Sequence, residues 1–433
     1  MQGFKLKVRL LLSMLVVMSL LGSTFMGTSY AAPSAATHGD HQKKDRDDND
    51  EIGFLLIDFQ QYWWNRAANP DKQAIAARGE AFIKLAKAQK LPMWITYEAS
   101  KEGEFGLPKA LKDAAKGIPE YVKMYFNSVA HADFAKQIRD SGIEQVVLAG
   151  AETDVCVAQT ALGLVEMGLD VYLLKDTVFS TEANVAPALK RLEQAGVKLI
   201  TFDYLQKSLA ADAELKPQQQ PSVKPLDEVV KYRKPGDIGT IVVNYQQARV
   251  DAAQPKNKAA IIARMQQMYL ALDIYGISRF YMVNDHNLAK QTPANHEYPL
   301  NRSEYTKTGS ELDQIAGLKK KLKADGIQIV ALSGVMTAEE LQRLALDLRE
   351  EDFDVYVLED ALLSPDANVH KTQQALYDQG VIPMTYKMMS YELWENVYPF
   401  DQRDQSKWNK KKLKDAVARK LVQAVEILPP IKP

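Results

Sequence analysis

The sequence predicts an α/β protein of two Rossmann-like three-layer domains, each a parallel sheet of about six strands flanked by helices. Short β-rich runs alternate with helix-length amphipathic segments, which is typical of parallel α/β sheets. The same order of elements returns later in the 433-residue chain with matching sequence. A hydrophobic fraction of 46% with 25% charged residues fits a globular protein with more than one core.

Hydrophobic periodicity places the elements of the first domain. The expected strands are residues 54–58, 93–97, 146–148, 171–174 and 198–202. The expected helices are residues 71–89, 154–167 and 186–195. Strands that alternate with helices in this way are expected to run parallel.

The repeat appears as a direct correspondence of sequence. VVLAGAETDVCVAQTAL matches VALSGVMTAEELQRLAL, and LDVYLLKDTVFSTEANV matches FDVYVLEDALLSPDANV. An offset of 184 positions relates Gly150 to Gly334 and Asp176 to Asp360. We therefore expect that one unit of domain size occurs twice.

Changes in composition mark the expected boundaries. The stretch KPQQQPSVKP breaks the hydrophobic pattern and indicates a linker. The last segment contains an amphipathic helix, residues 412–428, that we expect to pack across the domains or onto another subunit. The expected units are a first domain at 52–209, a linker at 210–236, a second domain at 237–398 and a tail at 399–433.

The N-terminus has the features of a signal peptide at residues 1–31. Three basic residues precede an apolar run at 10–21, and Ser29-Tyr30-Ala31 supplies a small-x-small cleavage site. The polar, charged residues 32–51 are expected to form a disordered spacer. The alternative is a retained anchor, but the run is shorter than the ~20 residues that span a bilayer. We expect a secreted or periplasmic protein with no stable membrane anchor after cleavage.

Net charge narrows the class of partner. A formal net charge of -1 gives no electrostatic reason to expect binding to nucleic acid or to an anionic membrane. A small-molecule substrate is the expected partner, and association of chains into a homo-oligomer is a further hypothesis. The single cysteine, Cys156, excludes an intramolecular disulfide.

Three reactive side chains follow predicted strands. Asp58 closes GFLLID, Lys123 closes PEYVK, and Cys156 starts a helix after QVVLAG. Ligands of parallel sheets bind beyond the carboxyl ends of the strands. A helix N-terminus and a nearby ammonium are expected to lower a thiol pKa, while a carboxylate takes its proton. The alternative is a structural cysteine beside an ordinary ion pair.

The segments LLIDFQ, VKMYFNS and GAETDVCVAQTALGLVEMGLDVYLLKDT resemble the isochorismatase-like cysteine hydrolases, a superfamily that includes nicotinamidases and YcaC-like proteins. The resemblance covers about residues 51–209. It implies a catalytic triad of Asp58, Lys123 and Cys156. It also implies a cis peptide between Ala151 and Glu152, with the N–H groups of Glu152 and Cys156 forming an oxyanion hole.

The same resemblance implies a substrate pocket. Gln60 and Trp63 occupy family pocket positions, and Tyr97, Glu98 and Phe126 follow strand ends that open on the same side. The alternative for these side chains is simple packing. Nicotinamidases of this superfamily carry metal-binding histidines after the second strand, where this chain has WITYEASKEGEFG. We therefore expect no metal and no cofactor, and His131 is expected to start a helix.

The second domain is expected to have lost the chemistry. Asp58, Lys123 and Cys156 align with Asn244, Lys307 and Glu340. Asparagine is not a carboxylate base and glutamate is not a thiolate, so the thiol mechanism cannot operate there. A ligand or metal site is an alternative for three polar residues of a later loop, namely Asp285, His286 and His296.

The favoured function is hydrolysis of a C–N bond in a small non-peptide amide. One alternative is a vinyl-ether hydrolase of the isochorismate type, which in this superfamily needs the aspartate but not the cysteine. Another is a noncatalytic ligand-binding or scaffold protein, because the second domain kept the repeat and lost the residues. The reactivity of Cys156 distinguishes these functions.

Overall fold

A computed structural model describes residues 52–68, 71–98, 106–123, 125–231, 236–254, 258–275, 278–282 and 311–397. All belong to one compact unit, residues 47–433. Several predictions lie outside the described residues: the signal peptide, the spacer, Asp285, His286, His296, Lys307 and the helix at 412–428.

The first sheet has six parallel strands in the order β3-β2-β1-β4-β5-β6. Its strands are β1 Ile52–Ile57, β2 Met93–Glu98, β3 Glu120–Lys123, β4 Gln145–Ala151, β5 Asp170–Phe179 and β6 Lys198–Ile200. The connecting helices are α2 Gln61–Arg66, α3 Lys72–Ala88, α4 Lys109–Lys112, η2 Ser128–Ala130, α5 Ala132–Ser141, η3 Thr153–Val157, α6 Ala158–Glu166, α7 Val185–Gln194 and α8 Phe202–Ala210. The predicted strands and helices of this half are confirmed to within a few residues at their ends.

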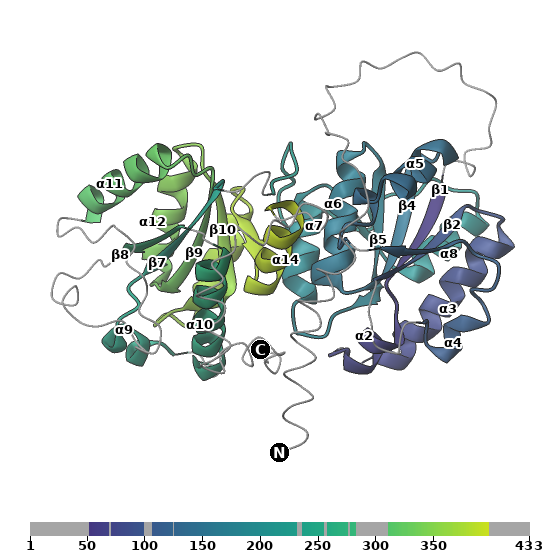
Figure 1. Ribbon diagram of the computed structural model, residues 1–433, viewed down its shortest axis with the longest axis horizontal. Coiled ribbons are helices and arrows are strands. Elements are labelled where there is room, and N and C mark those ends of the chain that lie inside the picture. The colour runs from purple at the N-terminus through teal and green to yellow at the C-terminus, as the bar shows by residue number, and fades with distance from the viewer. Residues whose placement is uncertain are drawn as a thin grey trace, which may run out of the picture. The chain divides into compact units, whose positions relative to one another are not determined.

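The second sheet has five parallel strands in the described part of the chain, in the order β11-β10-β9-β7-β8. Its strands are β7 Ile238–Val243, β8 Ser278–Met282, β9 Ile329–Val335, β10 Asp354–Leu363 and β11 Ile382–Met384. Its helices are α9 Gln247–Ala252, α10 Lys258–Tyr275, α11 Glu311–Ala324, α12 Ala338–Arg349, α13 Val369–Tyr377 and α14 Tyr386–Val397. Read from β8 to β11, the spatial order matches β2-β1-β4-β5-β6 of the first sheet. Figure 1 labels the strands β8, β7, β9 and β10 of this sheet.

Alternation along the strands creates three layers in the first half. Side chains of a strand point to opposite faces in turn, and every residue of β1 is buried. Phe54 and Leu56 pack with α3 and α8, whereas Leu55 and Ile57 pack with α5 and α6. The second sheet likewise carries one core cluster on each face. The predicted α/β class is therefore confirmed.

The strand order fixes where a site can form. Strand β1 lies between β2 and β4. The chain therefore adds β2 and β3 on one side of β1, and then β4, β5 and β6 on the other side. A crevice forms at such a reversal, outside the carboxyl ends of the strands. Asp58 directly follows β1, and the turn with Cys156 follows β4.

The segment between the halves packs against both of them. Leu215 is buried in a core cluster of the first half, and Val223 in a cluster of the second. Tyr172 donates a hydrogen bond to the Leu215 carbonyl at 2.6 Å, and Lys231 forms an ion pair with Glu166. No helix among the described residues is long and apolar enough to cross a bilayer.

Gly150, in the strand before the Cys156 turn, is expected to tolerate no side chain. It has φ 128°, and a Cβ there would lie 1.9 Å from the carbonyl oxygen of Ile57. Gly150→Ala should lower the free energy of unfolding by about 3 kcal/mol or more, measured by chemical denaturation. Gly168→Ala is the control, because that glycine also has a positive φ but open space around it. Its expected cost is about 1 kcal/mol, and equal losses in both variants would contradict the explanation.

Candidate active site

Asp58 is held at the end of β1 by two side chains from the strands β2 and β3. It has φ 43° and is fully buried. Lys123 Nζ donates to Asp58 Oδ2 at 2.6 Å, and Thr96 Oγ1 donates to Asp58 Oδ1 at 2.9 Å. Each carboxylate oxygen therefore accepts at least one hydrogen bond, and the carboxylate is fixed next to an ammonium.

Lys123 is a buried cation at the end of β3. Its side chain is 2% exposed, and Nζ also donates to the carbonyl of Tyr125 at 2.9 Å. Burial lowers the pKa of Lys123, but the negative charges around it outweigh burial and raise that pKa overall. The side chain is therefore charged at neutral pH.

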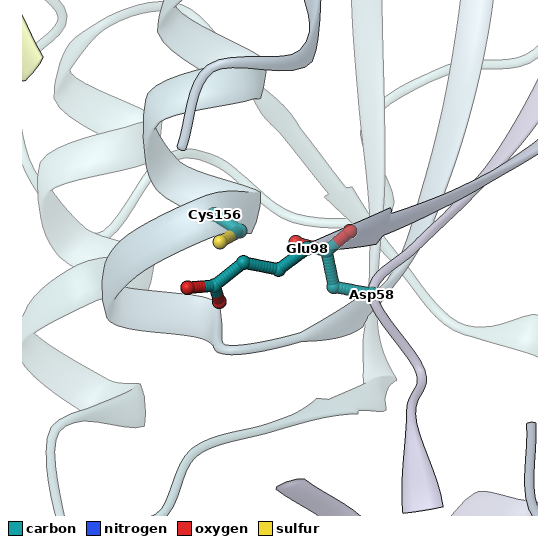
Figure 2. A group of neighbouring side chains, drawn as sticks. All are labelled: Asp58, Glu98 and Cys156. Carbon is teal, nitrogen blue, oxygen red and sulfur yellow. The ribbon is translucent and has the colours of Figure 1, made fainter. Parts of the chain in front are cut away.

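Cys156 lies in a π-helical turn, Thr153–Val157, that leads into α6. The thiol is 2% exposed. Cys156 Sγ and carboxylate oxygens of Asp58 and Glu98 all lie within 4.8 Å of one another (Figure 2). The structure thus brings the three predicted triad residues together and adds a second carboxyl group.

The expected lowering of the Cys156 pKa is wrong for the resting site. Burial raises the pKa of the Cys156 thiol well above its usual value, and Lys123 lowers it. The charges of Asp58 and Glu98 and a hydrogen bond with Asp58 raise it further. The helix start and the lysine are visible in the sequence, but the depth of burial is not. The resting side chain is therefore a thiol beside a carboxylate.

The cis peptide bond implied by the resemblance is present between Ala151 and Glu152. It is the only cis bond in the described ranges. The Glu152 carbonyl accepts hydrogen bonds from the amides of Val155 and Val157, both at 3.1 Å. These two hydrogen bonds connect the turn that carries Cys156 to Glu152, the residue after the cis peptide bond.

Glu98 is the carboxyl group that adjoins the three triad residues. Gln60 holds its backbone, because Gln60 Nε2 donates to the Glu98 carbonyl at 3.1 Å and the Glu98 amide donates to Gln60 Oε1 at 2.8 Å. Burial raises the pKa of Glu98 from 4.5 to about 7; Lys123 opposes the rise and Asp58 adds to it. The Gln60 amide thus positions Glu98.

The raised pKa of Glu98 gives a predicted pH dependence of stability. The folded chain keeps a proton on Glu98 that the unfolded chain loses at lower pH. This contribution is fully present below pH 4.5 and is lost as the pH rises to about 7. Glu98→Gln should flatten the fall in the free energy of unfolding across that window, measured by denaturation at each pH. An unchanged pH profile in Glu98→Gln would show that Glu98 does not supply this dependence.

The other predicted pocket residues are dispersed. Tyr97 lies in the core cluster on the opposite face of the sheet from Cys156 and donates to Glu120 Oε1 at 2.9 Å. Strand alternation was the available signal, since residues 96 and 98 share one face and residue 97 takes the other. Trp63 is partly exposed and packs against that same cluster. Phe126 packs against the cluster that contains Cys156.

The charges at the site bear on whether it could hold a metal. Asp58, Glu98 and Cys156 would offer two oxygen ligands and one sulfur to a cation. The Lys123 ammonium already binds one Asp58 oxygen at 2.6 Å. A positive charge is therefore supplied by the chain itself, and the expectation of no metal remains a prediction. His131 precedes α5 as its N-cap residue.

The corresponding position in the second half is built differently. Asn244 has φ 46°, close to the value at Asp58, and donates to Glu340 Oε1 at 3.2 Å. Glu340 is the third residue of α12 and forms a capping box with the N-cap residue Thr337, because each side chain accepts a hydrogen bond from the backbone amide of the other residue. An amide and a helix-capping carboxylate thus lie at the positions that the sequence alignment pairs with Asp58 and Cys156.

Comparison with known proteins identifies the first half. The isochorismatase domain model matches residues 53–203. Probable hydrolase YcaC of Escherichia coli (strain K12) is 32% identical over 163 residues, which cover 36% of this chain and 76% of that protein. The chain belongs to the isochorismatase family. Isochorismatase domain-containing protein 2A of Mus musculus is 31% identical over 163 residues, covering 37% of this chain and 73% of the relative.

Solved structures of the family align with a similar share of the chain. YcaC from Pseudomonas aeruginosa, solved with hexane-2,5-diol and covalent acrylamide, has a TM-score of 0.36 and 24% identity over 40% of this chain and 86% of that one. YcaC from Escherichia coli, described as an octameric hydrolase of unknown specificity, has a TM-score of 0.35 and 27% identity. That alignment covers 38% of this chain and 82% of that one.

Proposed function

We propose that this isochorismatase-family protein is a cysteine hydrolase that cleaves a C–N bond of a small non-peptide amide. The observation that carries the proposal is the arrangement around Asp58. Its carboxylate binds the Lys123 ammonium at 2.6 Å, and one of its oxygens lies within 4.8 Å of Cys156 Sγ. The arrangement supports the proposal because a thiol, a carboxylate and a fixed ammonium could act there as nucleophile, proton acceptor and charge-stabilising cation. Hydrolase names among the relatives support the reaction class.

The acylation step follows from the resting protonation states. Cys156 Sγ attacks the amide carbonyl carbon while its proton passes to the Asp58 carboxylate. Asp58 then gives that proton to the leaving nitrogen, the C–N bond breaks, and a thioester remains on Cys156. Lys123 stays charged throughout and stabilises the negative charge that moves between sulfur and carboxylate.

In the deacylation step Asp58 again acts first as a base and then as an acid, with water as the nucleophile and Cys156 Sγ as the leaving group. Water attacks the thioester carbon while Asp58 accepts its proton, and the acid is released as the thiol recovers a proton. The backbone N–H groups of Glu152 and Cys156 are proposed to hold the oxyanion in both steps. Trp63, in the helix α2 that follows the carboxyl end of β1, and Phe126 remain proposed substrate contacts. Gln60 is assigned a positioning role through Glu98, and Tyr97 is left out of the pocket.

The mature protein is proposed to act outside the cytoplasm, since residues 1–31 have the features of a signal peptide. Detecting the chain in the periplasmic or secreted fraction, with its N-terminus near Ala32, would support export. A cytoplasmic chain that keeps residues 1–31 would contradict it.

A ligand-binding protein without turnover is the second candidate. The raised Cys156 pKa favours it, because a nucleophile whose thiolate forms readily is easier to activate. Ammonia release from a panel of small amides, compared with pyruvate release from an isochorismate-type vinyl ether, separates the candidates. Release of ammonia would support the amidase, and release of pyruvate alone the ether hydrolase. Ligand binding with neither product would support the noncatalytic function.

A further inference from the structure

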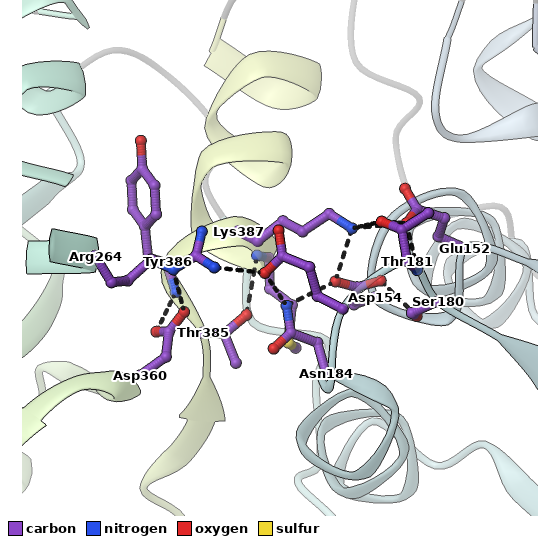
Figure 3. A network of polar contacts seen from close by, with 12 residues as sticks. Glu152, Asp154, Ser180, Thr181, Asn184, Arg264, Asp360, Thr385, Tyr386 and Lys387 are labelled. Atoms are coloured by element: carbon purple, nitrogen blue, oxygen red, sulfur yellow. Dashed lines mark hydrogen bonds and ion pairs between the residues drawn. The ribbon is translucent and has the colours of Figure 1, made fainter. Parts of the chain in front are cut away.

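The second half of the chain contacts the turn that carries Cys156. Lys387, in α14, donates from Nζ to Glu152 Oε1 at 2.8 Å and lies 3.3 Å from Asp154 Oδ2 (Figure 3). The side chains of Lys387, Glu152 and Asp154 are 9%, 5% and 0% exposed. A buried cation of one half therefore joins two buried carboxylates of the other.

Both carboxylates belong to the nucleophile turn. Glu152 follows the cis peptide bond, and Asp154 lies two residues before Cys156. The Thr181 amide donates to Glu152 Oε1 at 2.9 Å, and Ser180 Oγ donates to Asp154 Oδ1 at 2.7 Å. The Lys387 ammonium completes a network that fixes the turn against the loop after β5.

A third carboxylate of the first half uses the second half in the same way. Glu182 is buried, and Arg264 of α10 binds its Oε2 at 2.6 Å. In the described part of the chain, the ion pairs of Glu152, Asp154 and Glu182 are formed with Lys387 and Arg264. Buried carboxylates without a partner are strongly destabilised. The ionised form of this cluster therefore depends on cations from the second half.

The aligned residues of the two halves indicate that only the second half supplies such a cation to the other half. The position in the first half that corresponds to Lys387 is Asp203, an exposed residue that pairs with Lys207 one turn along α8. The residues that correspond to Glu152 and Asp154 are Met336 and Ala338. Neither half could therefore form this contact with a copy of itself.

We propose that the second half positions the nucleophile of the first: Lys387 holds the Glu152–Asp154 turn in the geometry that Cys156 needs. The inference rests on the proposed function for its catalytic meaning. Lys387 is a positioning residue, because it acts on Cys156 through the turn. A second contact supports the same role, since the rings of Tyr391 in α14 and Phe126 meet edge-on at 4.8 Å. A half without a thiol thereby remains necessary to the site.

The test compares two variants of the full chain that each remove a buried interface cation. Lys387→Met removes the contact to the nucleophile turn. Arg191→Met removes a buried ion pair between Arg191 of α7 and Glu392 of α14, the helix that also carries Lys387. Alkylation of Cys156 by iodoacetamide at pH 7 is the readout, with the midpoint of unfolding measured alongside.

Lys387→Met is expected to slow alkylation by about tenfold or more, since small displacements of a reacting group are costly. Arg191→Met should stay within about twofold of the wild type even where its unfolding midpoint falls. An unchanged rate in Lys387→Met, or equal slowing in both variants, would overturn the proposal. If Lys387→Met does not fold, Lys387→Met/Glu152→Gln, which removes one charge of each sign, is compared in the same way.

The readout separates this inference from the amidase proposal, because alkylation needs no substrate. A chain that hydrolyses no small amide, yet whose alkylation depends on Lys387, would keep the positioning role and remove the amidase function. Cys156-dependent hydrolysis that is unchanged in Lys387→Met would leave the amidase standing and overturn the positioning role.

Discussion

Cys156→Ala is expected to abolish amide hydrolysis, with kcat falling by roughly 10⁴-fold or more, as when a covalent nucleophile is removed elsewhere. The reason is specific to the mechanism: without Sγ no thioester can form, and Asp58 has no thiol proton to pass to the leaving nitrogen. Ammonia release under saturating substrate is the measurement.

The fold of that variant should survive. Removing one buried sulfur creates a small cavity and should change the free energy of unfolding by about 1 kcal/mol. Persistence of amide hydrolysis in Cys156→Ala would rule out the thioester route. Persistence of vinyl-ether hydrolysis alone would identify the ether reaction, which needs Asp58 and not the thiol.

Lys123→Met is expected to cause a large loss of stability. Its side chain and that of Asp58 are 2% and 0% exposed, and their charged atoms are 2.6 Å apart. Removing the cation leaves the Asp58 carboxylate buried without its partner, close to Glu98. Breaking a buried pair in this way costs about 3–5 kcal/mol, measured here as a shift in the denaturation midpoint.

Two control variants test whether the loss of stability comes from burial of the ion pair or from the loss of any ion pair. Lys84→Met breaks a pair with Glu80 at the same 2.6 Å distance, but those side chains are 64% and 34% exposed. Its expected cost is about 0–1 kcal/mol. Lys123→Met/Asp58→Asn removes both charges and should recover much of the lost stability. A double variant no more stable than Lys123→Met would show that the cost does not arise from the unpaired Asp58 carboxylate.

The sequence predicted the architecture well because its signals are local. Hydrophobic periodicity located β1, β4 and β5, and the repeat offset predicted an equivalent order for the second sheet. The family motif predicted that Asp58, Lys123 and Cys156 meet, and they do so because they lie at or just beyond the carboxyl ends of β1, β3 and β4 of one parallel sheet. Strand alternation, applied more strictly, would have separated Tyr97 from Glu98.

Other features have no local signal. Lys387 and Glu152 are 235 positions apart, and nothing near either residue indicates that they meet. Gln60 has the residue type of a substrate contact, but its amide is taken by the Glu98 backbone. The thiol pKa depends on burial and on two carboxylates whose distances arise only on folding. These interactions follow from packing between distant segments.

The most direct test of the central claim is the pH dependence of Cys156 alkylation by iodoacetamide in the wild-type protein. If the thiol passes its proton to the Asp58 carboxylate, the rate should reach a plateau between about pH 6 and 8, because no proton leaves the site. Asp58→Asn should lose that plateau. A wild-type rate that instead rises about tenfold for each pH unit between pH 6 and 8.5, the usual thiol pKa, would mean that the proton goes to solvent. That result would contradict the role of Asp58 as the base.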